Sequence, residues 1–213
     1  MTNAPVKLGF IGFGIMGERL LRAGMAHDPN VVAITGAFDP SAGAATRLKA
    51  TSPALVAYDT ADDVIAASDV LHIASPPLSH LDYLQRCHRA GKAALCEKPL
   101  AIDVAAATAV VAELKAAGMR AAVNFPFASS FAVDYLNRWI AEDVVGTPQC
   151  VDIDVAFKNW PRSWQMDAVT WLDARAEGGF AREVADRGVD HPSFRDELAD
   201  HISADIAAAA RHQ

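Results

Sequence analysis

Between residue 6 and about residue 127, short apolar runs alternate with longer stretches that have a helical pattern. The apolar runs are apolar throughout, which is typical of strands in a parallel sheet covered on both faces. Repeated strand–helix units predict an α/β fold with a doubly wound parallel sheet and the strand order 3-2-1-4-5-6. The predicted strands are residues 6–12, 31–39, 54–58, 69–75, 92–97 and 120–125, and the predicted helices are residues 15–26, 41–50, 60–68, 79–91 and 103–118, the last with Asp103 as its cap and Gly118 at its end.

The pattern changes in the last part of the chain, and we place a domain boundary between residues 123 and 124. A further helix is predicted at residues 129–143, and residues 149–158 then alternate between apolar and polar side chains, as a half-buried strand does. One strand is not stable alone, so it pairs with the edge of the first domain or with another chain, or else the region is unfinished; pairing with another chain makes it a candidate homo-oligomer interface. With a helical tail from Pro192, residues 124–213 predict an incomplete α+β second domain.

Composition narrows the functional classes. The 213 residues carry a net charge of −7, which argues against binding nucleic acid through its phosphates. No apolar run approaches the roughly 18 residues of a membrane span, and the run GFIGFGIMG lacks the flanks of a signal peptide. Three cysteines without CxxC spacing favour neither a disulfide framework nor a zinc site. We expect a cytoplasmic protein with no metal site and no nucleic-acid or membrane partner.

The segment GFGIMG places three glycines in GxGxxG spacing between the first predicted strand and helix. Such a turn lets the main chain approach a pyrophosphate, which the N–H groups at the start of the helix then bind. Asp39 ends the second strand, where a carboxylate can bind the ribose 2′-hydroxyl and would repel a 2′-phosphate, so NAD is favoured over NADP. The alternative for Asp39 is a helix cap, since DPSAG is also a good turn. The predicted cofactor-binding residues here are Gly12, Phe13, Gly14, Ile15, Met16, Gly17 and Asp39.

Two further segments, SPPLSH and CEKP, close the fourth and fifth predicted strands at the edge where ligands bind in doubly wound sheets. Ser75, Pro76 and His80 are candidate cofactor contacts, although His80 fits a surface position in the first helical turn equally well, and Ser79 is better explained as a helix cap. Glu97 and Lys98 are candidates for both cofactor binding and catalysis, since a lysine there can take part in proton transfer. The alternative is a surface ion pair.

Together, GxGxxG, Asp39, SPP with its histidine, and EKP resemble the glucose–fructose oxidoreductase and inositol 2-dehydrogenase family (Gfo/Idh/MocA), over residues 6–184. The resemblance implies a Rossmann domain, here residues 1–123, followed by a substrate domain with an open antiparallel sheet. It also implies a cis peptide before Pro99, Lys98 orienting a substrate hydroxyl, and Glu97 on the nicotinamide side. The substrate-binding positions that it implies are Lys98, Asn124, Lys158, Trp160 and Arg162, although packing in a small second core is an alternative for the tryptophans.

The resemblance weakens after the glycine pair at residues 178 and 179. Glu183 fits the family's acidic position and is counted with the substrate-binding residues, but Ala185 replaces a glycine and Arg187 replaces the catalytic histidine. Arginine stays protonated and cannot act as a general base near neutral pH. His191 lies four residues too late. Since most of the family's sheet domain is also missing, we expect a truncated or internally deleted member, and the sequence does not settle whether it is an active enzyme.

Three functions therefore remain open. The first is an NAD(P)-dependent oxidoreductase that acts on a secondary hydroxyl of a sugar, inositol or related polyol. The second is a catalytically impaired nucleotide-binding protein, acting as a sensor or pseudoenzyme. The third is a β-hydroxyacid dehydrogenase, since GFGIMG also suits the glycine turn of that family, although EKP and the absence of an all-helical second half count against it.

Overall fold

The structure, a computed structural model, describes residues 4–147, 149 and 150. The predicted half-buried strand at 149–158, the helical tail and most of the predicted second domain lie outside the described residues.

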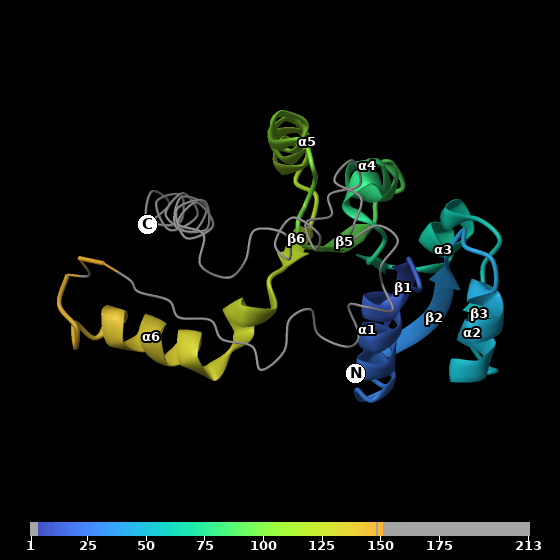
Figure 1. Ribbon diagram of the computed structural model, residues 1–213, viewed down its shortest axis with the longest axis horizontal. Coiled ribbons are helices and arrows are strands. Elements are labelled where there is room, and N and C mark those ends of the chain that lie inside the picture. The colour runs from blue at the N-terminus through green and yellow to red at the C-terminus, as the bar shows by residue number, and fades with distance from the viewer. Residues whose placement is uncertain (1–3, 148, 151–213) are drawn as a thin grey trace, which may run out of the picture. The chain divides into compact units, whose positions relative to one another are not determined.

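Six parallel strands form one sheet with the order β3-β2-β1-β4-β5-β6, which confirms the predicted doubly wound topology (Figure 1). The strands are β1 Val6–Ile11, β2 Val32–Phe38, β3 Val56–Ala57, β4 Val70–Ile73, β5 Ala93–Glu97 and β6 Ala121–Asn124. The helices are α1 Ile15–Met25, α2 Ala44–Thr51, α3 Ala61–Ala67, α4 His80–Arg89, α5 Val104–Ala116 and α6 Phe131–Ala141, with 3-10 turns at η1 Pro77–Ser79 and η2 Pro126–Ser129.

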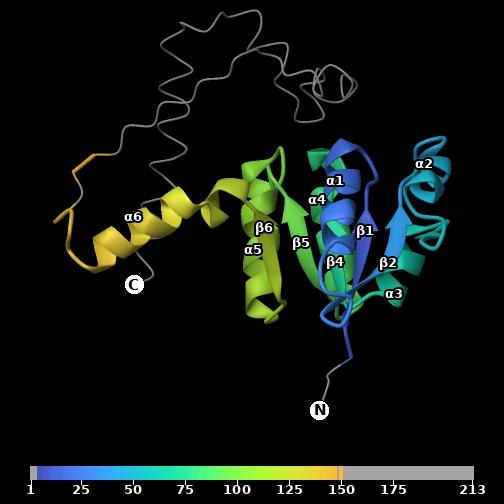
Figure 2. The same ribbon diagram turned by 90° about the horizontal axis from the view of Figure 1, so that it is seen from below.

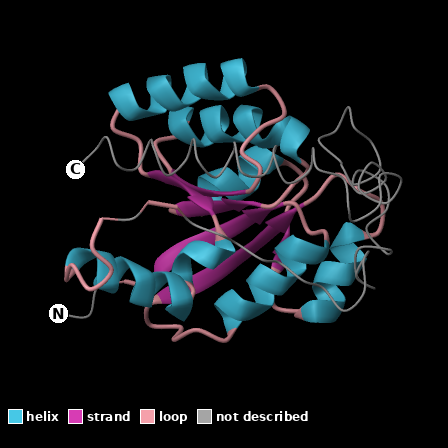
Figure 3. Cartoon of the chain, turned by 60° about the vertical axis from the view of Figure 1, so that its left-hand side comes forward, coloured by secondary structure: helices cyan, strands magenta, loops and turns pink. Residues whose placement is uncertain are grey.

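The helices lie on both faces of the sheet, with α1 and α2 on one side and α3, α4 and α5 on the other (Figures 1 and 3). Each face has its own cluster of buried side chains, and β1 contributes to both because successive side chains of a strand point to opposite faces. Phe10 lies with Phe13 and Leu21 on the α1 side, whereas Ile11 lies with Leu71 and other residues on the opposite side. The apolar runs are thus buried from both sides, as their lack of alternation predicted.

Local side chains explain most of the helix ends. The Asp103 carboxylate accepts a hydrogen bond from the Ala106 N–H at 3.0 Å, and Gly118 has φ +68 after the end of α5, so both predicted caps of this helix are confirmed. Helix α2 begins later than predicted because Gly43 has φ +77, a left-handed conformation that ends the preceding turn. Ser79 is the N-cap residue of α4, as predicted, but its hydroxyl is hydrogen-bonded to the Ser75 hydroxyl and the Pro76 carbonyl and accepts from no helix N–H.

Within the described part of the chain, no helix is long and apolar enough to cross a membrane. Helix α6 confirms the helix predicted at 129–143. Its first turn is capped by the Ser130 hydroxyl, which accepts from the Val133 N–H at 3.3 Å.

Candidate functional site

Because all the strands are parallel, the predicted site residues that follow them meet at one edge of the sheet (Figure 2). The turn after β1, the end of β2, the turn after β4 and the last residues of β5 and β6 all lie at this carboxyl edge. The strand order reverses between β1 and β4, which is where doubly wound sheets bind their ligands.

The glycines of the first turn differ in what surrounds them. Gly12 has φ +96, and a Cβ there would lie 2.5 Å from the Ser75 nitrogen. A Cβ at Gly17 would lie 2.1 Å from the Gly12 oxygen, so only glycine allows the helix to pack so close to the turn. A Cβ at Gly14, in contrast, would project into open space with no atom within 4 Å. Gly14 is also the N-cap of α1 and supplies no side chain to satisfy the helix N–H groups.

This arrangement fits a dinucleotide pyrophosphate. The first turn of α1 presents main-chain donors and the positive end of its dipole to the space beside Gly14, which an anion can occupy. Ile15 and Met16 at the start of the helix are partly exposed there, whereas Phe13 is buried in the core on the α1 side.

Asp39 is bonded both to the glycine turn and to its own turn. Its Oδ2 accepts from the Phe13 N–H at 2.6 Å, while its Oδ1 accepts from the Ser41 N–H at 2.8 Å and from the Ser41 hydroxyl. Asp39 thus stabilises the turn DPSAG but caps no helix, since the N-cap of α2 is Gly43, so the helix-cap alternative was wrong. The carboxylate is still partly exposed beside the glycine turn, which is compatible with a ribose contact as well.

His80 is fully buried, with 1% of its surface exposed, so the interpretation as a surface residue was wrong. Its Nδ1 lies 2.9 Å from the Pro99 oxygen and its Nε2 lies 2.7 Å from the Ser75 oxygen. The ring therefore bridges the turn after β4 and the turn after β5. Burial lowers the pKa of His80, and its main-chain carbonyl partners, with the charge of Glu97, oppose this only in part.

Glu97 is buried as well, which contradicts the alternative of a surface ion pair. Its Oε1 lies 3.1 Å from His72 Nε2 and accepts from Asn124 Nδ2 at 2.6 Å. Burial alone would raise the pKa of Glu97. The hydrogen bonds from His72 and Asn124, together with the electrostatic interactions with His72 and Lys98, outweigh burial and hold this pKa below its usual range.

Lys98 follows directly and is exposed at the carboxyl edge. The peptide bond between Lys98 and Pro99 is cis, as the resemblance implied.

Cys96, one residue before Glu97, is fully buried, and burial raises the pKa of its thiol to about 12, so it is no reactive thiolate.

The sequence reasoning missed His72. This residue lies in the middle of an apolar strand, where the pattern marks only a buried position. The signal that could have found it is the polar ring itself, since a buried histidine needs a hydrogen-bond partner. Among the predicted substrate-binding residues, Asn124 is brought next to Glu97, while Lys158, Trp160, Arg162 and Glu183 lie outside the described residues, as do Arg187 and His191.

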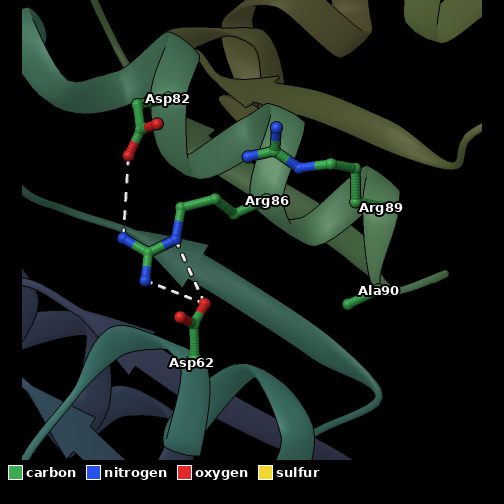
Figure 4. A pocket seen from close by; sticks show the side chains of 5 residues that line it. All are labelled: Asp62, Asp82, Arg86, Arg89 and Ala90. Carbon is green, nitrogen blue, oxygen red and sulfur yellow. Dashed lines mark hydrogen bonds and ion pairs between the residues drawn. The ribbon is translucent and has the colours of Figure 1, made fainter.

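A separate hollow of about 520 Å³ lies on the surface between α3 and α4 (Figure 4). Arg86 lies 2.8 Å from Asp62 and 3.6 Å from Asp82, so its charge is already paired (Figure 4). Burial would lower the pKa of Arg86, but these carboxylates raise it overall. Because the charges neutralise one another, we assign no ligand to this hollow.

Comparisons with known proteins agree with this geometry. The chain is 34% identical over 152 residues to inositol 2-dehydrogenase 1 of Saccharopolyspora erythraea, covering 68% of this chain and 44% of that protein. It is 36% identical over 98 residues to the rhizopine catabolism protein MocA of Rhizobium meliloti, covering 45% of this chain and 30% of that protein. The chain thus spans less than half the length of these curated relatives.

Solved structures show the same fold. An NAD-binding oxidoreductase from Klebsiella pneumoniae superposes with a TM-score of 0.59 at 28% identity, over 68% of this chain and 40% of that one. The apo scyllo-inositol dehydrogenase from Lactobacillus casei gives a TM-score of 0.63 at 19% identity, over 68% of this chain and 44% of that one, which supports the fold alone.

The family assignment rests on the first domain. Residues 6–125 match the family model GFO_IDH_MocA, described as an oxidoreductase family with an NAD-binding Rossmann fold. This match does not favour the β-hydroxyacid dehydrogenase or the sensor as an alternative. The matched segment contains the glycine turn, Asp39, SPP with His80, and EKP, and the chain therefore belongs to the Gfo/Idh/MocA family of NAD-binding oxidoreductases.

Proposed function

We propose that this protein binds NAD(H) at the glycine turn and oxidises a secondary hydroxyl of an inositol, sugar or related polyol. The observation that carries the proposal is the open space beside Gly14 at the uncapped start of α1, in a chain of an NAD-binding family. The names of the inositol 2-dehydrogenase relatives support a polyol as the substrate class.

The predicted cofactor contacts follow the carboxyl edge. The turn from Gly12 to Gly17 would hold the pyrophosphate, and the partly exposed Asp39 carboxylate would accept hydrogen bonds from the adenosine ribose. A carboxylate in that place disfavours a 2′-phosphate, so we propose NAD and not NADP. Further contacts are proposed for Ser75, Pro76, His80, Glu97 and Lys98.

The nicotinamide, when bound, supplies the chemistry of hydride acceptance. Lys98 is exposed at the same edge and would orient the reacting hydroxyl with its ammonium group. Both hydrogen bonds to Glu97 in the described structure reach Oε1, so Oε2 retains acceptor capacity toward a ligand. Asn124 donates its amide to Glu97 and keeps its Oδ1 for a substrate hydroxyl. Substrate contacts by Lys158, Trp160, Arg162 and Glu183, the cytoplasmic location, and a homo-oligomer through residues 149–158 stay predictions.

The test has two stages. Titration of the purified protein with NADH and with NADPH, followed by nucleotide fluorescence, should show saturable binding that is tighter for NADH. Reduction of NAD is then measured across a panel of inositols and sugars, with wild type, Lys98→Ala and the control Lys115→Ala, an exposed lysine in the last turn of α5.

We expect turnover that Lys98→Ala abolishes and Lys115→Ala preserves. Absence of NADH binding would refute the proposal as a whole. Binding without turnover on any polyol would refute the oxidoreductase assignment for this chain and leave a nucleotide-binding protein.

A further inference from the structure

Three side chains from adjacent strands meet at the carboxyl edge beside Lys98. In the strand register, His72 of β4 pairs with Leu95 of β5, and Glu97 of β5 pairs with Asn124 of β6. Leu95 and Glu97 are two residues apart and point to the same face of the sheet, so His72, Glu97 and Asn124 share that face. Glu97 thus lies directly opposite Asn124 and diagonally across from His72, within reach of both.

The hydrogen bonds of this group converge on one oxygen atom. Glu97 Oε1 is 3.1 Å from His72 Nε2 and 2.6 Å from Asn124 Nδ2. An ionised carboxylate has only acceptor sites, so both partners must donate. This assigns a proton to His72 Nε2 and orients the Asn124 amide with its nitrogen toward Glu97.

The histidine ring is itself held in place. His72 is 3% exposed and stacks on Phe10 of β1, with ring centroids 5.4 Å apart and an angle of 11° between the planes. The direction of its Nε2–H is therefore fixed by packing from the neighbouring strand.

A buried pair of this kind is expensive. Burying an ionised carboxylate away from water is unfavourable, and apolar residues of similar volume are often as stable as a buried polar pair. Stability alone therefore gives little reason for His72 and Glu97 at these positions. The geometry suggests another role for the pair, which is to orient Lys98. Glu97 is the last residue of β5, and Lys98 follows it where the chain leaves the sheet.

We propose that His72 is a positioning residue, which clamps the Glu97 carboxylate together with Asn124 and so fixes the main chain from which Lys98 extends. The proposal rests on the proposed function for the role of Lys98, but the clamp itself can be tested without any ligand. With Oε1 bonded to both donors, Oε2 is the Glu97 oxygen that keeps acceptor capacity for a ligand.

The test compares His72→Leu, which removes the donor, with His72→Gln, which keeps an N–H donor, and with His27→Leu, an exposed histidine next to α1, as control. NMR on the labelled full chain gives three readouts without ligand: the protonated nitrogen of His72, the carboxyl pKa of Glu97, and the main-chain amide shift of Lys98. NADH affinity is the fourth readout.

We expect the wild-type proton on Nε2. His72→Leu should raise the Glu97 pKa, displace the Lys98 amide signal and weaken NADH binding by about tenfold, the lower end of the loss seen when a hydrogen-bond partner of a metal ligand is removed. His72→Gln should restore all three, which a general loss of stability would not, and His27→Leu should change none. If His72→Leu does not fold, His72→Asn, whose side chain is too short to reach Oε1, replaces it.

A proton on Nδ1 alone, or a Lys98 signal that is unchanged in the folded His72→Leu protein, would overturn the proposal. The same holds if His72→Gln behaves like His72→Leu. If wild type binds no NADH, the proposed function fails, and the three NMR readouts still decide whether the clamp exists.

Discussion

Gly14 and Gly17 lie three residues apart in one turn, yet a single added methyl group should affect them in opposite ways. In Gly17→Ala, the new Cβ would lie 2.1 Å from the Gly12 oxygen and 3.0 Å from the Gly12 carbon. Both are main-chain atoms, so the helix must move away from the turn. Overpacking of this kind costs about 1–3 kcal/mol of the free energy of unfolding.

Gly14→Ala should leave the fold nearly unchanged. Its Cβ meets no atom within 4 Å, and φ −75 with ψ −167 is an extended conformation that alanine adopts readily. Alanine is a poorer N-cap than glycine, which lowers the free energy of unfolding, whereas it reduces the entropy of the unfolded chain, which raises that free energy. Each effect is worth up to about 1 kcal/mol. The methyl group would occupy the space that we assign to the pyrophosphate, so NADH binding should weaken severely.

Urea denaturation followed by circular dichroism measures the first effect, and NADH fluorescence titration measures the second. We expect Gly17→Ala to lower the free energy of unfolding and Gly14→Ala to lower affinity without a matching loss of stability. The reasoning is refuted if Gly14→Ala binds NADH as tightly as wild type, or if both variants lose the same stability.

Four further predictions follow from individual side chains. Asp39→Ala should weaken NADH binding and reduce the preference over NADPH, measured by parallel titrations; an unchanged preference would exclude the ribose role. His80 has its pKa lowered in the fold, so its contribution to the free energy of unfolding should be fully present above pH 6.5 and decline as the pH falls below that value, with a flatter profile in His80→Gln. Glu97 has a lowered pKa too, so its contribution should persist down to about pH 4.5 and be lost below it, as urea midpoints at each pH would show; a Glu97→Gln profile as steep as wild type would contradict this. Cys87 and Cys96 are fully buried, and burial raises the pKa of each thiol to about 12, so a thiol reagent should modify them only after unfolding; rapid labelling of either in the native protein would argue against the described core.

The sheet could be predicted from the sequence because its apolar runs are long enough to identify buried strands, and parallel strands joined by helices have few possible orders. The strand predicted at 54–58 is shorter in the structure and comprises only Val56–Ala57, because only these two residues pair with β2. The first residue of a helix depends on local features such as the conformation of Gly43, and the pattern of apolar residues does not predict these features.

The sequence predicted which turns form the candidate site, but not which of their side chains contact one another. The end of each strand identifies which residues gather at the carboxyl edge. The pairing of His72 with Glu97 depends on strand register, which short apolar runs do not specify. The burial of His80 likewise depends on which face of α4 meets the turn after β5, and this face follows from tertiary packing.

Because β1 contributes side chains to the core on both faces of the sheet, it should open less often than the strands at the edges. β1 lies between two neighbouring strands and contributes side chains to both core clusters, so its main-chain amides should exchange with solvent deuterium only through global unfolding. The glycine turn is attached to this strand and persists as long as the domain does. β6 is paired on one side only in the described sheet, so we expect its amides to exchange sooner than those of β1, which would release Asn124 and loosen Glu97 first. Under the proposed function, dinucleotide binding would therefore rest on the part of the sheet that we expect to persist longest, and the orientation of Lys98 on a part that we expect to open sooner.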